Sequence, residues 1–121
     1  MGDIKRHRKK FSRPKTPWTK ERIESEKELK KGYGLLRNRE IWKAEAKLRK
    51  FKRQVKRLVP LKTKQAELER KQLMDKLIRM GLLNNKDDMN KVLELTVSDI
   101  LNRRIQTLAV KKGLATTMKQ A

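Results

Sequence analysis

The segment from residue 39 to residue 59 constrains the fold of this chain most, because it carries one continuous apolar stripe. Six apolar side chains recur there at spacings of three and four residues: Ile41, Ala44, Leu48, Phe51, Val55 and Leu58. This spacing places them on one face of an α-helix. Asn38 can cap the helix and Pro60 halts it. Since only 36% of the chain is hydrophobic, we expect a modest core that is divided between this helix and others.

Cap and stop residues predict one helix before this segment and another after it. Thr19 is the predicted N-cap of a first helix, whose acidic start and basic end suit the helix dipole and which stops at Gly32. A third helix is predicted from about residue 64 to residue 80, with Gly81 as its left-handed stop. Residues 84–88 are a polar connector to a short helix at 89–95.

Two capping-box patterns mark the last part of the chain. Thr96 and Asp99 form the first, and the residues that follow predict one helix over 97–112 that closes at Gly113. Thr117 and Gln120 form the second, close to the end of the sequence. A helix start signal without a helix body leads us to expect that something is missing beyond Ala121, as in a fragment, a truncated sequence or a naturally shortened protein.

The net charge points to a polyanionic partner. The chain has 35 Lys and Arg against 14 Asp and Glu, a formal +21. Residues 1–60 hold 22 Lys and Arg against 7 Asp and Glu, a net +15, and residues 61–121 hold 13 against 7, a net +6. Charge of this size repels itself in a compact fold, so we expect the free protein to be marginally stable. Nucleic acid is the first partner to consider.

Two regions carry most of this charge. Residues 1–18 have two prolines, seven basic residues and no apolar periodicity, which predicts an extended basic arm suited to following a phosphate backbone. The alternative is a disordered basic tail without fixed contacts. On the central helix, four cations point away from the apolar stripe and Arg49 and Lys56 lie between the two faces. Those four residues are Arg39, Lys50, Arg53 and Arg57.

Both features have plainer interpretations. An ordinary solvated helix face would also be rich in Lys and Arg, since both are good helix formers. Trp42 lies off the stripe, on the side of Arg49 and Lys56. It can stack on a base or a ribose, or it can pack between two helices, which is the commoner role of tryptophan.

Several classes of function are excluded or unsupported. The chain has no cysteine, and its single histidine, His7, lies in a basic run, so metal sites, disulfides and catalytic triads have no residues to build on. We therefore expect no enzyme activity, no cofactor and no small-molecule substrate. No apolar run is long enough for a membrane span, and the start lacks the apolar core of a signal peptide, so we expect a cytoplasmic protein without a membrane partner.

Three separated motifs resemble one family. They are YGL at 33–35 followed by REIWKAE at 39–45, LIRMGLL at 77–83, and LTVSDILNRRIQTLAVKKGLATTMKQA at 95–121. Together they resemble small-subunit ribosomal protein S-four in its archaeal and eukaryotic form, and KKF at 9–11 and PW at 17–18 fit the archaeal type. The expected fold is all-α: a basic arm at 1–18, a small helical bundle at 19–95, and at 96–121 the first helix of a truncated S-four-type RNA-binding domain.

The resemblance implies a structural protein that binds small-subunit ribosomal RNA directly. Family members nucleate assembly of the 5′ domain near a multi-helix junction, lie beside ribosomal protein S-five and support translational fidelity. The arm residues expected to follow RNA are Arg6, Arg8, Lys9, Lys10, Arg13 and Lys15. The positions that match the family's RNA-binding module are Arg103, Arg104, Gln106, Thr107, Lys111, Lys112 and Lys119.

Alternatives remain at the levels of residue and protein. Arg103 and Arg104 can instead form an ion pair with Asp99 or contact a neighbouring helix, and adjacent helical residues cannot both face RNA. At the level of the protein, the alternative is a ribosome-assembly factor of the related processome family. A detached part of an RNA-modifying or aminoacylating enzyme is a third hypothesis, which no catalytic motif supports.

Overall fold

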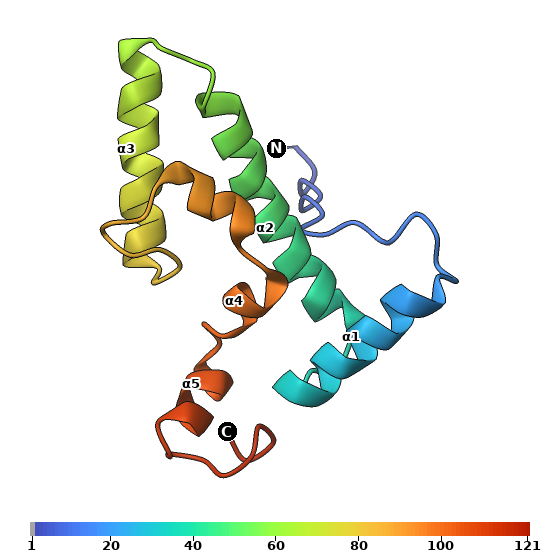
Figure 1. Cartoon of the computed structure of the whole chain (residues 1–121). Coiled ribbons are helices and arrows are strands. Elements are labelled where there is room, and N and C mark those ends of the chain that lie inside the picture. The colour runs from blue at the N-terminus through green and yellow to red at the C-terminus, as the bar shows by residue number, and fades with distance from the viewer. Residues whose placement is uncertain (1) are drawn as a thin grey trace.

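The computed structural model describes residues 2–121, and within them the fold is all-helical, as predicted, with no strand. Figure 1 shows α2 as a long diagonal helix with the other elements arranged around it. None of the helices in this part of the chain is both long and apolar enough to cross a membrane. The elements are α1 (Lys20–Tyr33), α2 (Asn38–Leu58), α3 (Lys64–Arg79), the 3-10 helix η1 (Met89–Glu94), α4 (Val97–Leu101) and α5 (Ile105–Lys111).

Helix α2 is the centre of the core. All six residues of the predicted stripe are buried, and α2 packs against α1, α3, η1 and α4. In Figure 1, α3 turns back beside the C-terminal half of α2, α1 lies at its N-terminal end, and the chain crosses α2 again at η1. Leu77 of α3 and Val92 of η1 are fully buried against this stripe. The core is therefore divided among short helices that share one long one.

The ends of α1 and α2 differ from the prediction. Helix α1 continues through Gly32 to Tyr33 and is capped by Gly34, whose φ of 64° is left-handed and whose N–H donates to the Lys30 carbonyl. A Cβ on Gly34 would lie 2.7 Å from the Met118 Cβ, so the close approach of the C-terminal turn also requires glycine. Asn38 is the first residue of α2 rather than its cap, because Arg37 is the extended residue at this position. The Glu40 carboxylate instead accepts from the Leu36 N–H at 3.0 Å.

Side chains fix both ends of the α2–α3 hairpin. The Thr63 hydroxyl accepts from the Ala66 N–H at 3.1 Å and caps α3. The Arg70 guanidinium donates to the carbonyls of Leu58, Val59 and Leu61. These carbonyls lie at and just beyond the end of α2, where helical partners are missing. The predicted left-handed stop after α3 is confirmed, since Gly81 has a φ of 78°.

The predicted single helix over 97–112 is wrong. The Thr96 and Asp99 capping box is present, with the Thr96 N–H donating to the Asp99 carboxylate at 2.8 Å. Helix α4 then ends at Leu101, and Arg104 is extended, so α5 starts afresh in another direction. As a result Ile105, expected on the buried face, is 83% exposed.

Tertiary hydrogen bonds explain this break. The Arg103 Nε donates to the Met80 carbonyl at 2.9 Å, and the Arg104 Nη1 donates to the Tyr33 carbonyl at 3.0 Å. These carbonyls lie at the C-terminal ends of α3 and α1, where positive charge is favoured. Adjacent arginines in one continuous helix would diverge by about 100°. Opening the helix lets both side chains reach their carbonyls.

Candidate nucleic-acid interface

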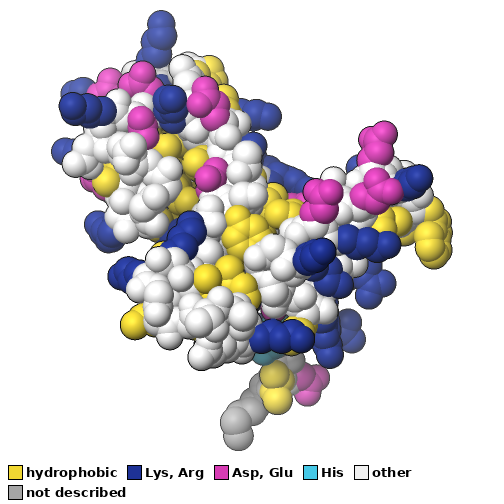
Figure 2. All heavy atoms as spheres, turned by 60° about the horizontal axis from the view of Figure 1, so that its bottom comes forward, with side chains coloured by type: hydrophobic (Ala, Val, Ile, Leu, Met, Phe, Trp, Pro, Cys, Tyr) yellow, Lys and Arg dark blue, Asp and Glu magenta, His cyan; other side chains and the backbone are white. Residues whose placement is uncertain are grey.

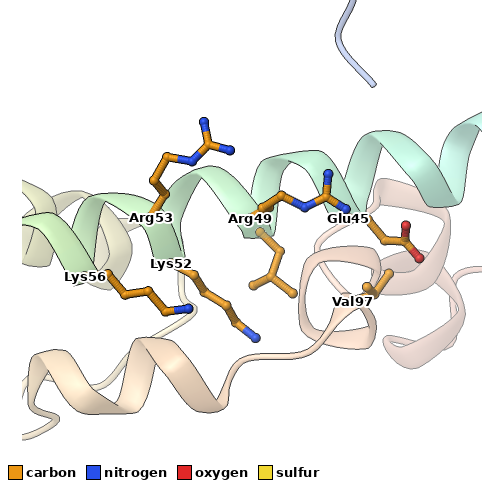
Figure 3. A pocket seen from close by; sticks show the side chains of 7 residues that line it. Glu45, Arg49, Lys52, Arg53, Lys56 and Val97 are labelled. Atoms are coloured by element: carbon orange, nitrogen blue, oxygen red, sulfur yellow. The ribbon is translucent and has the colours of Figure 1, made fainter. Parts of the chain in front are cut away.

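A cationic groove runs along α2. Four of its side chains, Arg49, Lys52, Arg53 and Lys56, line a depression of about 420 Å³ together with Glu45, Leu48 and Val97. Figure 3 shows Lys52 and Lys56 reaching over the gap between α2 and the segment that leads to α4, while Arg53 points away from it. The four cations come from two consecutive turns of one helix, so their backbone positions are fixed relative to one another.

The charge of this groove is not neutralised within the protein. None of the four groove cations has a carboxylate oxygen within 4 Å among the ion pairs of residues 2–121. The Arg49 Nη1 donates to the Ser12 hydroxyl, at 3.3 Å. Unpaired cations held side by side raise the local potential and attract anions such as phosphates. The groove is thus chemically suited to a phosphate backbone.

Glu45 is the one acidic side chain that lines the groove. Its partial burial and the nearby charge of Glu26 raise the pKa of the Glu45 carboxyl, while Arg49 and Arg22 act in the opposite direction. The raised pKa means that the fold disfavours the ionised form of this residue. Neutralising Glu45 would leave the groove wholly cationic.

Besides the hydrogen bond between Arg49 and Ser12, two further contacts attach the arm to the helices. The Phe11 and Trp42 ring centroids lie 6.1 Å apart at an interplanar angle of 35°, a favourable aromatic geometry. The Arg22 Nη2 donates to the Pro17 carbonyl at 2.9 Å. Trp42 is half-buried, so it packs against Phe11 and still leaves part of its surface exposed. The described part of the arm, residues 2–18, has no helix or strand, yet it is docked against α1 and α2.

A buried carboxylate organises this attachment. Glu26 is only 5% exposed. One of its oxygens accepts both from the Arg22 Nη1 at 2.7 Å and from the Trp42 Nε1 at 3.0 Å. The pairing satisfies a charge that would otherwise be costly to bury and fixes the indole plane.

The predicted cations of α2 and the arm lie at the surface. Arg57 differs from the others because it forms an ion pair with Glu69 at 3.4 Å. Figure 2 shows how widely Lys and Arg side chains are spread over one face of the molecule. The exposed residues of this group are Arg6, Arg8, Lys9, Lys10, Arg13, Lys15, Arg39, Lys50, Arg53 and Arg57.

The predicted residues near the C-terminus fall into two groups. Lys111, Lys112 and Lys119 are exposed and Gln106 is half-buried. Thr107 is 2% exposed and its hydroxyl donates to the Leu101 carbonyl at 3.2 Å, so the fold already uses this side chain. Arg103 and Arg104 bind the backbone carbonyls described above, rather than Asp99.

The predicted binding residues did not include Arg49, Lys52 or Lys56. Lys52 follows Leu48 by four residues and precedes Val55 by three, so it flanks the apolar stripe. Such flanking cations usually lie along the apolar surface of a packed neighbour. Only the path of the chain from η1 to α4, which leaves a gap beside α2, shows that these side chains line a groove.

Comparison with known proteins gives the class and the family. No protein-family model matches the chain. It is 43% identical over 121 residues to small ribosomal subunit protein uS4 of Methanothermobacter thermautotrophicus, covering all of this chain and 71% of the relative. It is 47% identical over 122 residues to small ribosomal subunit protein uS4 of Saccharolobus islandicus, covering all of this chain and 67% of the relative.

These relatives and the helical fold define a protein of the small ribosomal subunit. The chain belongs to the uS4 family. The resemblance to the S-four family that the three sequence motifs carry is therefore confirmed.

Proposed function

We propose that this chain is a structural protein of the small ribosomal subunit that binds ribosomal RNA directly through the cationic surface of α2. The groove formed by Arg49, Lys52, Arg53 and Lys56 carries this proposal, since none of these cations has a carboxylate oxygen within 4 Å among residues 2–121. The arm extends the same surface, because Ser12 accepts a hydrogen bond from Arg49 at the groove. Lys111 at the end of α5, Lys112 and Lys119 are also exposed and offer further contacts to RNA.

Recognition of RNA by this surface rests on phosphate positions and on shape. The major groove of A-form RNA is too deep and narrow for side chains to distinguish bases. Arginine forks grip phosphate oxygens through two hydrogen bonds, whereas lysines act as point charges. Cations fixed along one helix therefore favour RNA whose phosphates follow a matching path.

The family resemblance extends this proposal to a place in the subunit. We expect the chain to act in the cytoplasm, to nucleate assembly of the 5′ domain, to lie beside ribosomal protein S-five and to support translational fidelity. The role requires no catalysis and no cofactor. The alternative function is that of an assembly factor that leaves the mature particle, and recovery of the chain from translating subunits separates the two.

Charge substitution in the groove tests the proposal. A variant with Arg49→Gln, Lys52→Gln, Arg53→Gln and Lys56→Gln is compared with a control that carries the same loss of charge on exposed residues elsewhere. The control is Lys62→Gln, Lys64→Gln, Lys71→Gln and Arg79→Gln. Affinity for small-subunit ribosomal RNA is measured over a salt series.

The groove variant should lower the magnitude of the log–log salt slope by about 3, since each lost phosphate contact removes roughly 0.7 to 0.9. The control should retain most of the slope of the unmodified chain. Equal losses in both variants would contradict the proposal, because general charge and not the groove would then determine binding.

A further inference from the structure

A second cavity lies between the arm, α1 and α2. Its volume is about 610 Å³, within the range of pockets that hold small ligands. Trp42, Ile23 and Pro17 give it an apolar wall, and Lys27 and Lys30 of α1 lie at its edge. The cavity is distinct from the groove, since the two share no lining residue.

The aromatic wall is held in a fixed orientation. The hydrogen bond from the Trp42 Nε1 to Glu26 and the ring contact with Phe11 anchor the indole from two directions. The Arg22 Nε, beside the same carboxylate, is buried and has no hydrogen-bond partner in the described part of the chain. A rigid indole loses little conformational entropy when a second planar group stacks on it.

The cations of the cavity are available to an anion. Among residues 2–121, Glu26 is the only acidic residue that lines the cavity, and its Oε1 already accepts from Arg22 and Trp42. Within residues 2–121, no carboxylate oxygen lies within 4 Å of the Lys27, Lys30, Arg13 or Lys15 side-chain nitrogens. Both the arm and α1 thus contribute free positive charge to the rim of an apolar pocket.

We infer that this cavity binds one unpaired nucleotide of RNA, with its base against Trp42 and its phosphates against Lys27 and Lys30. A fixed aromatic wall with cations beside it matches an unstacked nucleotide, because every base has a face that can stack and every nucleotide has a phosphate. Paired bases cannot enter, since their faces are covered by neighbouring base pairs. This inference rests on the proposed function and adds a site for a looped-out base to a surface that otherwise contacts phosphates.

The fluorescence of Trp42 tests the inference directly. The chain has two tryptophans, and Trp18 is 89% exposed, so Trp18→Phe leaves Trp42 as the sole indole without disturbing the core. This variant is titrated with a short unpaired oligoribonucleotide, an RNA duplex with the same number of phosphates, and inorganic polyphosphate. The unpaired RNA should quench Trp42, while the duplex and the polyphosphate should bind without quenching it.

Matched lysine variants complete the test in the same background. Lys27→Gln with Lys30→Gln removes two charges that line the cavity, and Lys20→Gln with Lys31→Gln removes two from the same helix outside it. The first pair should weaken binding of the unpaired oligoribonucleotide by about tenfold, because each lost ion pair at a solvent-exposed rim is worth roughly two- to fivefold in affinity. The second pair should have a much smaller effect.

Two outcomes overturn the inference in distinguishable ways. If all three polyanions quench Trp42 alike, or if RNA binds through the groove while Trp42 fluorescence stays constant, the cavity does not take a base and the proposed function stands. If neither RNA binds at all, the proposed function fails together with the inference.

Discussion

At the scale of single residues, the fold places acidic groups where their charge has consequences. Glu26 is paired twice inside the protein, whereas Glu45 lines the groove at a partly buried position, where Arg49 is the groove cation that acts on its charge. Because the folded state raises the pKa of Glu45, this fold binds a proton at that residue more tightly than the unfolded chain does. Ionised Glu45 therefore lowers the stability of the fold above its folded pKa, and the loss is relieved as the pH falls through that value.

Glu45→Gln should consequently be more stable than the unmodified chain at pH 7. The difference in the free energy of unfolding should shrink as the pH falls below the raised pKa, where Glu45 is neutral in the folded state. Urea unfolding at a series of pH values from neutral to acidic measures this difference, with Glu67→Gln at an exposed position as control. A Glu45→Gln protein that is less stable than the unmodified chain at pH 7 would refute the assignment.

Most individual contacts at this scale were beyond prediction from sequence. Exposure of the α2 and arm cations follows from their spacing and composition, which is why those positions were identified. Burial of Thr107 and the binding of Arg104 to Tyr33 join positions far apart in the sequence. No local pattern encodes such pairs.

At the scale of elements, α2 shows what periodicity can determine. Its stripe can be predicted because six apolar residues at helical spacing can all be buried only on one face of a helix, and Pro60 prevents the helix from continuing. The break between α4 and α5 was missed for the opposite reason. Apolar spacing runs through it without interruption, and only the backbone carbonyls offered to Arg103 and Arg104 by other helices favour opening the chain there.

Arg70 also donates to backbone carbonyls at a helix end, which leads to a prediction about α2. Arg70→Ala should lower the free energy of unfolding by about 2 kcal/mol, because it leaves the carbonyls at the end of α2 without their charged donor. Lys71→Ala, an exposed neighbour on the same helix, is the control and should change stability by less than about 0.5 kcal/mol. Chemical denaturation of both variants measures the difference. An Arg70→Ala protein as stable as the control would show that water replaces the guanidinium without loss.

At the scale of the whole molecule, the net positive charge lowers the stability of the fold. A net +21 is balanced by few ion pairs, since those of residues 2–121 involve four Lys or Arg residues, and three of the four pairs lie largely at the surface. Repulsion between the remaining cations raises the free energy of the folded state, and salt screens it.

The melting temperature of the free protein should therefore rise between about 0.1 M and about 1 M sodium chloride, over which the screening length falls from roughly 10 Å to roughly 3 Å. Thermal unfolding followed by circular dichroism measures the change. The groove variant with four Gln substitutions should begin at a higher melting temperature in low salt and gain less. A melting temperature that falls with added salt would mean that attractive ion pairs outweigh repulsion.

The affinity of the chain for the 5′-domain junction of small-subunit ribosomal RNA, compared with an unrelated duplex of equal length over a salt series, tests the central claim most directly. Nonspecific charge attraction fades with salt for both RNAs, while a fit to phosphate positions and an unpaired base persists. The account predicts that the junction RNA keeps a clear advantage at high salt. Equal affinities with equally steep slopes would contradict it, because residues 1–121 would then attract polyanions without recognising RNA shape.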